Sequence, residues 1–146
     1  FLLSLLVQAD WAAALDFLGL NDLRPYQAEA VTAISVSNSR VLLHFQTGSG
    51  KTCTMLFPFV LDVLQQSRLG NFSIALCFVP LLALQADHVG KLKQSPGLKT
   101  CVDVFSLAVP DDLTDCVKLL RQKKLGKSIL IFLNPERYAE VSVLLH

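Results

Sequence analysis

Short apolar runs alternate with longer helical segments along this chain, and the alternation is the feature that most constrains its fold. Four runs are short and largely apolar, at residues 41–45, 73–79, 100–105 and 128–133. Runs of this kind are typical of strands that are buried on both faces of a parallel sheet. Because helical segments separate them, we expect an α/β fold, with a parallel sheet and helices packed on both of its faces.

The segments before and between these runs have apolar residues at helical spacing. We expect helices at residues 2–18, 25–35, 55–64, 81–92, 113–124 and from 136 onward. Pro25 suits the first turn of its helix, where the missing N–H of proline is not needed. No repeat, low-complexity tract or shift in composition marks a domain boundary.

The composition is strongly apolar, with 52% hydrophobic and only 17% charged residues. A helix that spans a membrane needs about 20 consecutive apolar residues. The longest charge-free run, residues 69–86, contains Gly70, Asn71, Ser73 and Pro80. We therefore expect no membrane span and attribute the composition to a buried sheet. The net charge of +1 disfavours nucleic-acid binding by a broadly basic surface.

The four cysteines, Cys53, Cys77, Cys101 and Cys116, are widely spaced and form no C-x-x-C pair. This spacing predicts neither a zinc site nor a disulfide framework, and reduced thiols fit an intracellular protein. The apolar start of the chain lacks the basic segment and the cleavage site of a signal peptide. The single methionine is Met55, so we expect the chain to be a piece of a longer protein.

A glycine-rich loop, Q-T-G-S-G-K-T at residues 46–52, lies between an expected strand and an expected helix. Gly48 and Gly50 allow backbone angles that turn successive N–H groups toward a phosphate, and the helix start adds a favourable dipole. Lys51 can reach the β- and γ-phosphates, and the Thr52 hydroxyl is placed to bind Mg²⁺. The sequence therefore predicts a site for nucleotide phosphates, and we call residues 46–52 the phosphate loop.

The loop has the short form T-G-x-G-K-T, in which Thr47 and Ser49 complete the cradle. The glycine that opens the strict pattern is replaced by Phe45. The alternative interpretation is an ordinary Gly-Ser loop with an exposed lysine, which the expected strand before it and helix after it disfavour. Cys53, beside the loop, is interpreted as a small packing residue and not as a reactive thiol.

Four blocks follow one another in the chain: L-G-L-N-D-L-R-P-Y-Q at 18–27, the phosphate loop, P-L-L-A-L-Q-A-D-H-V at 80–89 and N-P-E-R-Y at 134–138. Together they resemble superfamily 2 helicases of the DEAD/DEAH type, and among them the RecQ-like DNA helicases. The first block is similar to the adenine-recognition segment F-G-x-x-x-F-R-P-x-Q, with leucine at both aromatic positions. This resemblance implies that Gln27 hydrogen-bonds the adenine edge, since a carboxamide has both donor and acceptor, and that Arg24 lies near the base. Pro58, in the helix after the loop, matches a proline of the family.

The last two blocks resemble motif Ia, P-L-x-x-L-x-x-D-x-V, and motif Ib, A-P-E-R-L, and each follows an expected strand. In the family these turns contact the backbone of single-stranded DNA. The resemblance therefore implies nucleic-acid contacts by Pro80, Leu81, Gln85, Asn134, Pro135 and Arg137. Backbone N–H groups at a helix start suit a phosphate, so such contacts can be local in a nearly neutral chain. A plain strand-to-helix turn is the alternative for the block at 80–89.

The resemblance as a whole implies a P-loop NTPase fold of the RecA-like type, truncated at the C-terminal side. Residues 1–146 are expected to form part of the helicase ATP-binding domain, with an N-terminal helix at 1–20 before the adenine-recognition segment. The implied activity is ATP hydrolysis coupled to 3′-to-5′ DNA unwinding, with Lys51 and Thr52 as catalytic residues and ATP and Mg²⁺ as cofactors. The implied partners are single-stranded DNA and the duplex junction, with no zinc in this segment, and the implied location is intracellular, in the nucleus if the protein is eukaryotic.

Hydrolysis in this family needs a D-E-x-H motif that holds Mg²⁺ and positions water, and a second lobe with an arginine finger. The sequence contains no D-E-x-H, so we expect the isolated 146 residues to bind nucleotide without turnover. Asp111 and Asp112 are a poor substitute, because Pro110 interrupts the approach to them. Two alternatives stay open. One is an RNA helicase of the DEAD-box type or another P-loop NTPase, and the other is an inactive helicase-like fragment.

Overall fold

The computed structural model describes residues 2–36, 40–46, 48–122 and 126–143. The chain divides into two units, unit 1 at residues 1–69 and unit 2 at residues 70–146. The phosphate loop belongs to unit 1, and both turns with expected nucleic-acid contacts belong to unit 2. Each unit is a separate packed body and is described by itself.

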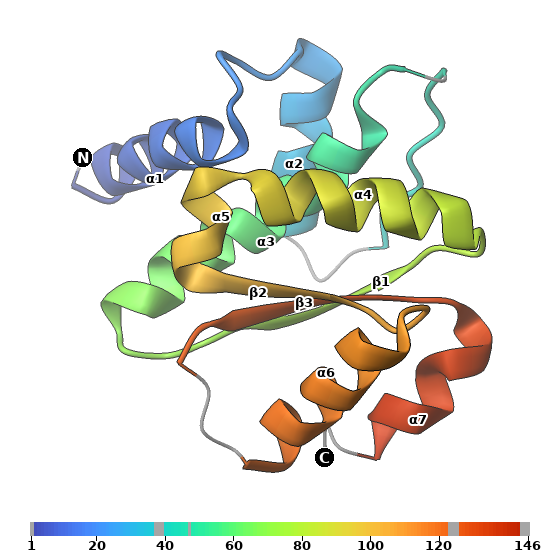
Figure 1. Cartoon of the computed structure of the whole chain (residues 1–146). Coiled ribbons are helices and arrows are strands. Elements are labelled where there is room, and N and C mark those ends of the chain that lie inside the picture. Colours follow the sequence, from blue (N-terminus) through green and yellow to red (C-terminus); the bar gives the residue numbers. More distant parts are fainter. Residues whose placement is uncertain (1, 37–39, 47, 123–125, 144–146) are drawn as a thin grey trace. The chain divides into compact units, whose positions relative to one another are not determined.

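The described elements of unit 1 are three helices, α1 (Leu2–Leu18), α2 (Pro25–Val36) and α3 (Lys51–Arg68), drawn in Figure 1. They confirm the helices that the sequence predicts there, and α3 extends beyond the predicted helix at both ends. Helix α3 packs against α1 and α2. Its Phe57 and Val60 are buried, and the Trp11 ring centroid of α1 lies 4.8 Å from that of Phe57. The helix that follows the phosphate loop therefore forms the centre of this unit.

The strand predicted at residues 41–45 is wrong, because the described residues 40–46 form no strand. Leu42, in the middle of the predicted strand, is 93% exposed. An apolar run becomes a strand only where a neighbouring strand takes up its backbone hydrogen bonds, and the described elements of unit 1 are all helices. The run leads instead into the phosphate loop, with the Phe45 ring centroid 4.7 Å from that of Tyr26.

Unit 2 contains a parallel sheet of three strands, β1 (Ile74–Phe78), β2 (Val102–Ser106) and β3 (Ser128–Leu133), in the order β1-β3-β2. All three lie where the sequence predicts strands, with small differences at their ends. The central strand β3 is buried at all six positions, which accounts for its uninterrupted apolar sequence. Phe78 pairs with Leu133, and Ser106 pairs with Phe132. The carboxyl ends of the three strands therefore lie at the same edge of the sheet.

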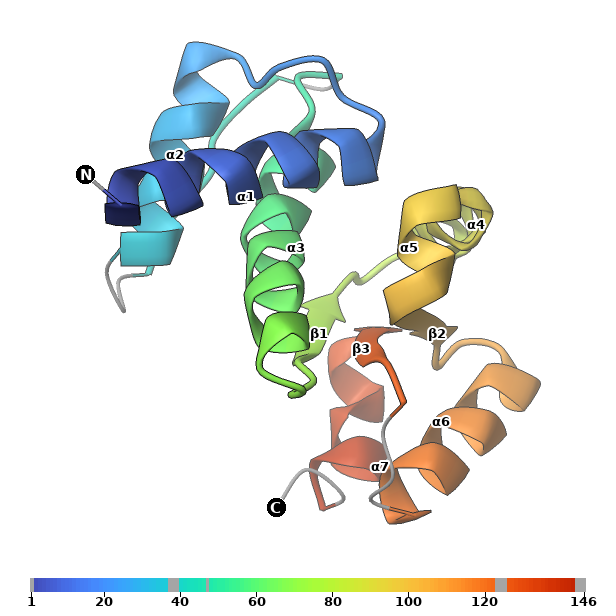
Figure 2. The same cartoon turned by 90° about the vertical axis from the view of Figure 1, so that its left-hand side faces the viewer.

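Helices cover both faces of this sheet. Figures 1 and 2 show α4 (Leu82–Gln94) and α5 (Pro96–Cys101) on one face, and α6 (Pro110–Gln122) and α7 (Tyr138–Ser142) on the other. His88 of α4 stacks on Phe132 of β3. The opposite face carries a buried apolar cluster made of Leu107, Cys116, Leu120, Ile129, Ile131 and Leu133. The predicted α/β class is confirmed, and the sheet is consistent with part of a RecA-like fold.

Several helical elements of unit 2 begin at a proline that the sequence analysis did not assign to a helix start. Helix α5 starts at Pro96, α6 starts at Pro110 rather than at residue 113, and a 3₁₀ turn, η1 (Pro135–Arg137), precedes α7. Proline suits the first turn of a helix because its φ is already helical and its missing N–H is not needed there. These prolines explain why α6 begins earlier than apolar spacing alone predicts, and Pro96 opens α5, a helix that the sequence did not predict and that takes in residues 100 and 101 of a predicted strand.

Strand β2 pairs with β3 on one side only among the described strands. Backbone donors at its two ends have other partners: the Val102 N–H donates to Leu98 O, and the Ser106 N–H donates to Asp112 Oδ2 at 2.8 Å. Engaged donors and nearby charged side chains are typical of a sheet edge that does not recruit a further strand.

None of the helices in the described residues combines the length and apolar character needed to cross a membrane. The apolar residues are instead concentrated in places such as β3, which is buried throughout. A parallel sheet covered on both faces requires such continuously apolar strands.

Candidate nucleotide and nucleic-acid sites

The phosphate loop turns at two glycines and then opens directly into α3. Gly48 has φ 80° and Gly50 has φ 84°, values that glycine adopts without strain. Gly50 is the N-cap residue of α3, and no side chain of the described residues caps the helix there. The first N–H groups of α3 are therefore available to an anion at the positive end of the helix dipole. Thr47, also predicted in this site, lies outside the described residues.

Gln27 joins the predicted adenine-recognition segment to the loop. Its Nε2 group donates to Ser49 O at 3.2 Å and to Gly50 O at 3.4 Å, and its Oε1 accepts from the Arg24 N–H at 2.9 Å. Gln27 is only 7% exposed, and a Cβ atom at position 50 would lie 2.5 Å from its Nε2. Both the positive φ and the close approach of Gln27 therefore require glycine at position 50.

The Gln27 carboxamide keeps one hydrogen-bonding position for a base. A carboxamide has two N–H donors and two acceptor lone pairs. Both donors contact the loop and one lone pair accepts from Arg24. The remaining lone pair of Oε1 can accept from an amino group such as that of adenine, and a second bond to the base requires release of the longer contact to Gly50 O. The structure brings Gln27 and the loop together, and the adenine contact stays a prediction.

Tyr26 is a residue of this site that the sequence analysis missed. Its hydroxyl donates to Ser49 O at 2.9 Å and accepts from Arg24 Nη1 at 3.0 Å. Its ring packs on Phe45, which stands where the strict phosphate-loop pattern has glycine. The signal that could have found it is the presence of two aromatic residues at positions where the family patterns specify none, Tyr26 in the first block and Phe45 directly before the phosphate loop.

Lys51 and Ser49 supply polar groups that the chain leaves available. Lys51 Nζ donates to Phe45 O at 2.7 Å and to Gln46 O at 3.4 Å. These partners are neutral carbonyls, so the lysine charge can pair with an incoming phosphate. Ser49 Oγ is buried and has no hydrogen-bond partner among the described residues. A hydroxyl left without a partner in a glycine turn fits a loop that closes around a polyphosphate.

Thr52, the predicted Mg²⁺ ligand, is half-buried in the first turn of α3. Mg²⁺ is usually bound through a few protein oxygens together with nucleotide phosphates and water. Within the described ranges, no group of three or more His, Cys, Asp or Glu residues could hold a metal ion. A threonine hydroxyl at the start of α3 fits Mg²⁺ that binds together with a nucleotide, and binding of Mg²⁺ by Thr52 stays a prediction.

In unit 2, the two turns with predicted nucleic-acid contacts lie side by side. Strands β1 and β3 are neighbours, and the Val79 N–H donates to Leu133 O at 2.9 Å where both turns begin. We call residues 80–84 and 134–137, which follow these positions, the carboxyl edge. Ligands of open α/β sheets bind preferentially outside the carboxyl ends of the strands.

Both turns of the carboxyl edge end in a helix start. Leu81 is the N-cap residue of α4, without a side-chain cap among the described residues, and Pro135 opens η1. Asn134 Nδ2 donates to Glu136 Oε2 at 2.7 Å, and Arg137 is half-buried. The exposed predicted residues are Pro80, Leu81 and Pro135. Helix-start N–H groups and one arginine can together contact a phosphate backbone.

Gln85 does not belong to this surface, and its predicted contact with nucleic acid is corrected. The side chain is fully buried. Its Nε2 group donates to Val79 O at 2.7 Å, and its Oε1 accepts from Ser106 Oγ at 3.2 Å. The helical spacing of α4 turns position 85 toward the sheet, while residues 81–84 are exposed.

Two residues considered as alternative reactive groups, Cys53 and Asp112, fit structural roles. Burial raises the pKa of the Cys53 thiol, which keeps it protonated and supports its interpretation as a packing residue. Asp112 accepts from Lys93 Nζ at 2.8 Å and from the Ser106 N–H. These contacts assign Asp112 to the packing of unit 2 and give no support to a metal-binding role.

Comparison with protein families identifies the chain. The model of the family described as DEAD/DEAH box helicase matches residues 24–143. This span contains Arg24, Gln27, the phosphate loop and the carboxyl edge. Comparisons with curated proteins and with solved structures gave no match. Proteins of the matched family are in general nucleic-acid helicases that use ATP with Mg²⁺. Because the match covers well over half of its length, the chain belongs to the DEAD/DEAH box helicase family.

Proposed function

We propose that the chain is the ATP-binding part of a RecQ-like helicase that couples ATP hydrolysis to 3′-to-5′ unwinding of DNA. Family membership supports the class of ATP-dependent helicase. The assignment to RecQ and to DNA rests on the order of the sequence blocks at 18–27, 80–89 and 134–138. In this proposal unit 1 binds the nucleotide and the carboxyl edge of unit 2 contacts DNA.

The observation that carries the nucleotide part is the contact of Gln27 with Ser49 O and Gly50 O. It joins the segment that resembles an adenine reader to the loop that resembles a phosphate cradle. When ATP and Mg²⁺ are bound, they supply the γ-phosphoryl group and the charge that polarises it. Of the chain's own residues, Gln27 orients the base, Lys51 offsets phosphate charge and Thr52 holds the metal.

The nucleic-acid part is supported by the meeting of two turns at one sheet edge. The exposed start of α4 offers backbone N–H groups, and Arg137 adds a positive charge in the turn that follows the neighbouring strand β3. A few local contacts of this kind suit a chain whose net charge is only +1. The N-P-E-R sequence that opens η1 favours the RecQ-like assignment over other branches of the superfamily.

Binding measurements on the 146-residue chain test both parts. We expect Mg²⁺–ATP to bind in preference to Mg²⁺–GTP, and single-stranded DNA to bind more tightly than RNA of the same sequence. Stronger binding of RNA would contradict the DNA assignment and favour the DEAD-box alternative. Absence of binding to any nucleotide would favour the inactive fragment.

The variants Arg137→Ala and Lys127→Ala locate the DNA surface. Both remove one positive charge, but Arg137 follows β3 at the carboxyl edge, whereas Lys127 precedes β3 at its other end. We expect Arg137→Ala to reduce the slope of log affinity against log salt by about 0.7, the value for one phosphate contact on a single strand. Lys127→Ala should leave the slope unchanged. Equal effects of the two variants would argue for diffuse attraction and against a defined edge.

A further inference from the structure

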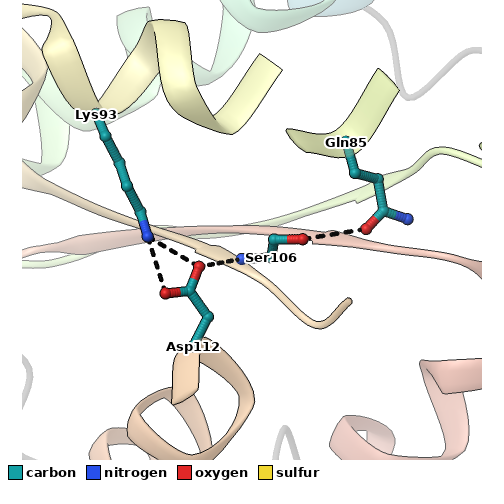
Figure 3. Close-up of polar contacts among 4 residues, drawn as sticks. All are labelled: Gln85, Lys93, Ser106 and Asp112. Atoms are coloured by element: carbon teal, nitrogen blue, oxygen red, sulfur yellow. Dashed lines mark hydrogen bonds and ion pairs between the residues drawn. The ribbon is translucent and has the colours of Figure 1, made fainter. Parts of the chain in front are cut away.

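A series of buried hydrogen bonds lies directly behind the carboxyl edge. Gln85 of α4 donates from Nε2 to Val79 O at 2.7 Å, and its Oε1 accepts from Ser106 Oγ at 3.2 Å. Both side chains are almost completely inaccessible to solvent. Figure 3 shows the Gln85 carboxamide pointing toward Ser106 at the end of β2. The amide nitrogen of Gln85 thus bonds to the residue that follows β1, and its amide oxygen bonds to the last residue of β2.

The series of hydrogen bonds continues from Ser106 to the surface. The Ser106 N–H donates to Asp112 Oδ2 at 2.8 Å, and Lys93 Nζ contacts both oxygens of that carboxylate at 2.8 Å (Figure 3). Lys93 lies near the end of α4, and Asp112 lies in the first turn of α6. The outer ion pair is partly exposed, so we expect it to contribute less than the buried bonds.

The carbonyl that Gln85 holds is the last one before the turn. The sheet ladder ends where the Val79 N–H donates to Leu133 O, and Pro80 has no N–H to continue it. The direction of the peptide between Val79 and Pro80 is therefore set by the bond to Gln85. That peptide leads directly to Leu81, the N-cap residue of α4. Gln85 thus bonds to the carbonyl that lies two residues before this N-cap.

A glutamine at this buried position is costly unless both ends of its amide are satisfied. An apolar residue of similar length would fill the same space under α4 without that requirement. Apolar residues make up most of the buried positions among the described residues, including Val89 of the same helix. The placement of an amide here therefore indicates a role in backbone geometry beyond the filling of volume.

We infer that Gln85 is the positioning residue of the carboxyl edge, acting through Val79 O, and that Ser106 fixes the orientation of its amide. Gln85 touches no nucleic acid in this scheme. It holds the turn at residues 79–81 so that the start of α4 meets successive phosphates of a single strand. This inference rests on the proposed DNA contact at the carboxyl edge and adds the group that sets its geometry.

The test compares Gln85→Met with Ser128→Ala in the 146-residue chain. Methionine keeps the length of the side chain but cannot hold Val79 O. Ser128 is equally buried, and its Oγ accepts from the Ser73 N–H at 3.0 Å at the opposite edge of the same sheet. The measurements are the thermal midpoint of unfolding, the affinity for Mg²⁺–ATP and the affinity for a single-stranded DNA oligonucleotide.

We expect Gln85→Met to weaken DNA binding about tenfold, the effect of losing one buried hydrogen bond that sets the contact geometry. Its ATP affinity should stay within about twofold of the parent, because the phosphate loop belongs to the other unit. Ser128→Ala should lower the thermal midpoint without weakening DNA binding. Ser106→Ala should weaken DNA binding by about threefold, since the bond to Val79 O is kept but its orienting partner is lost.

Three results with the variants, and two with the parent chain, would overturn the inference. The first is DNA binding by Gln85→Met within about twofold of the parent, and the second is an equal loss in Ser128→Ala. If Gln85→Met does not fold, Ser106→Ala provides the test instead. The third contradicting result is a DNA affinity of Ser106→Ala that equals that of the parent chain. A parent chain that binds ATP but no DNA overturns this inference and leaves the nucleotide part of the proposed function standing. A parent chain that binds neither contradicts both.

Discussion

In unit 1 the phosphate loop is held by side chains that bond to its backbone carbonyls, whereas in unit 2 the carboxyl edge is held by strand pairing together with one buried side chain, Gln85. Gln27 and Tyr26 both donate to Ser49 O, and Lys51 donates to Phe45 O. At the carboxyl edge, by contrast, the last ladder bond joins Val79 to Leu133. The loop therefore depends on a few exchangeable contacts, and the edge depends on the sheet and on the buried bond from Gln85 to Val79 O.

This difference predicts how the two regions respond to substitution. A side chain that bonds to a backbone carbonyl can release it when a ligand offers that side chain a stronger hydrogen-bond partner. The loop can therefore rearrange around a nucleotide. Backbone bonds in a buried ladder do not exchange in this way. Single substitutions should therefore have large effects around the loop, while exposed positions at the carboxyl edge should tolerate change better than buried Gln85.

The largest effect is expected for Lys51→Ala. We expect it to weaken Mg²⁺–ATP binding by about 100-fold, because charge-assisted hydrogen bonds to phosphate contribute about 1.5–3 kcal/mol each. DNA affinity should not change. Lys91→Ala is the control, since it removes the same charge from the exposed pair with Asp87. Titration of a fluorescent nucleotide measures both variants, and equal nucleotide affinity of Lys51→Ala and the parent would remove the loop from the site.

Gly50→Ala should come next, with nucleotide affinity lowered by about tenfold. The new Cβ atom would meet Gln27 Nε2 at 2.5 Å and would also occupy a backbone with φ 84°. Gly19→Ala is the matched control, because Gly19 has φ 66° but nothing within 4 Å of an added Cβ. Both variants should lose stability in thermal unfolding. A comparable loss of nucleotide affinity in Gly19→Ala would show that backbone strain alone is responsible.

Gln27→Ala is expected to erode the preference for ATP over GTP. The variant loses the Oε1 atom that can accept from the adenine amino group, and it also loses the donors to Ser49 O and Gly50 O. We expect the ratio of ATP to GTP affinity to fall by about fivefold, as for one specific hydrogen bond. Competition titrations with both nucleotides measure the ratio. An unchanged ratio would mean that the base is read elsewhere.

Tyr26→Phe should have the smallest effect, a loss of about threefold in nucleotide affinity. The change removes the hydroxyl that links Arg24 to Ser49 O but keeps the ring against Phe45. Tyr138→Phe makes the same chemical change in unit 2 and should leave nucleotide affinity unaltered. If both variants bind nucleotide as the parent does, Tyr26 serves only to pack against Phe45.

The sequence predicts three of the strands and the helices other than α5 well because their apolar spacing matches their burial. Strand β3 is buried at every position, and its run of apolar residues has no other plausible location. The run at 41–45 is just as apolar but has no neighbouring strand among the described elements of its unit. Apolar sequence predicts burial and not the presence of a hydrogen-bonding partner, which explains this failure.

The candidate site was predictable where a residue type is required by chemistry. Positive φ at Gly48 and Gly50, and the start of α3 at Lys51, follow from the loop pattern. Tyr26 was missed because no pattern specifies its contact with Ser49 O. Gln85 was assigned to the wrong surface because a resemblance to a motif places residues along the chain but does not say which face of the helix is buried.

Amide hydrogen exchange of the 146-residue chain tests the central claim most directly, namely that nucleotide binds at the phosphate loop and DNA binds at the carboxyl edge. The account predicts that Mg²⁺–ATP slows exchange at residues 48–54 and leaves residues 81–84 unchanged. Single-stranded DNA should slow exchange at residues 81–84 and leave the loop unchanged. Protection by ATP at the carboxyl edge without protection of the loop would contradict the account.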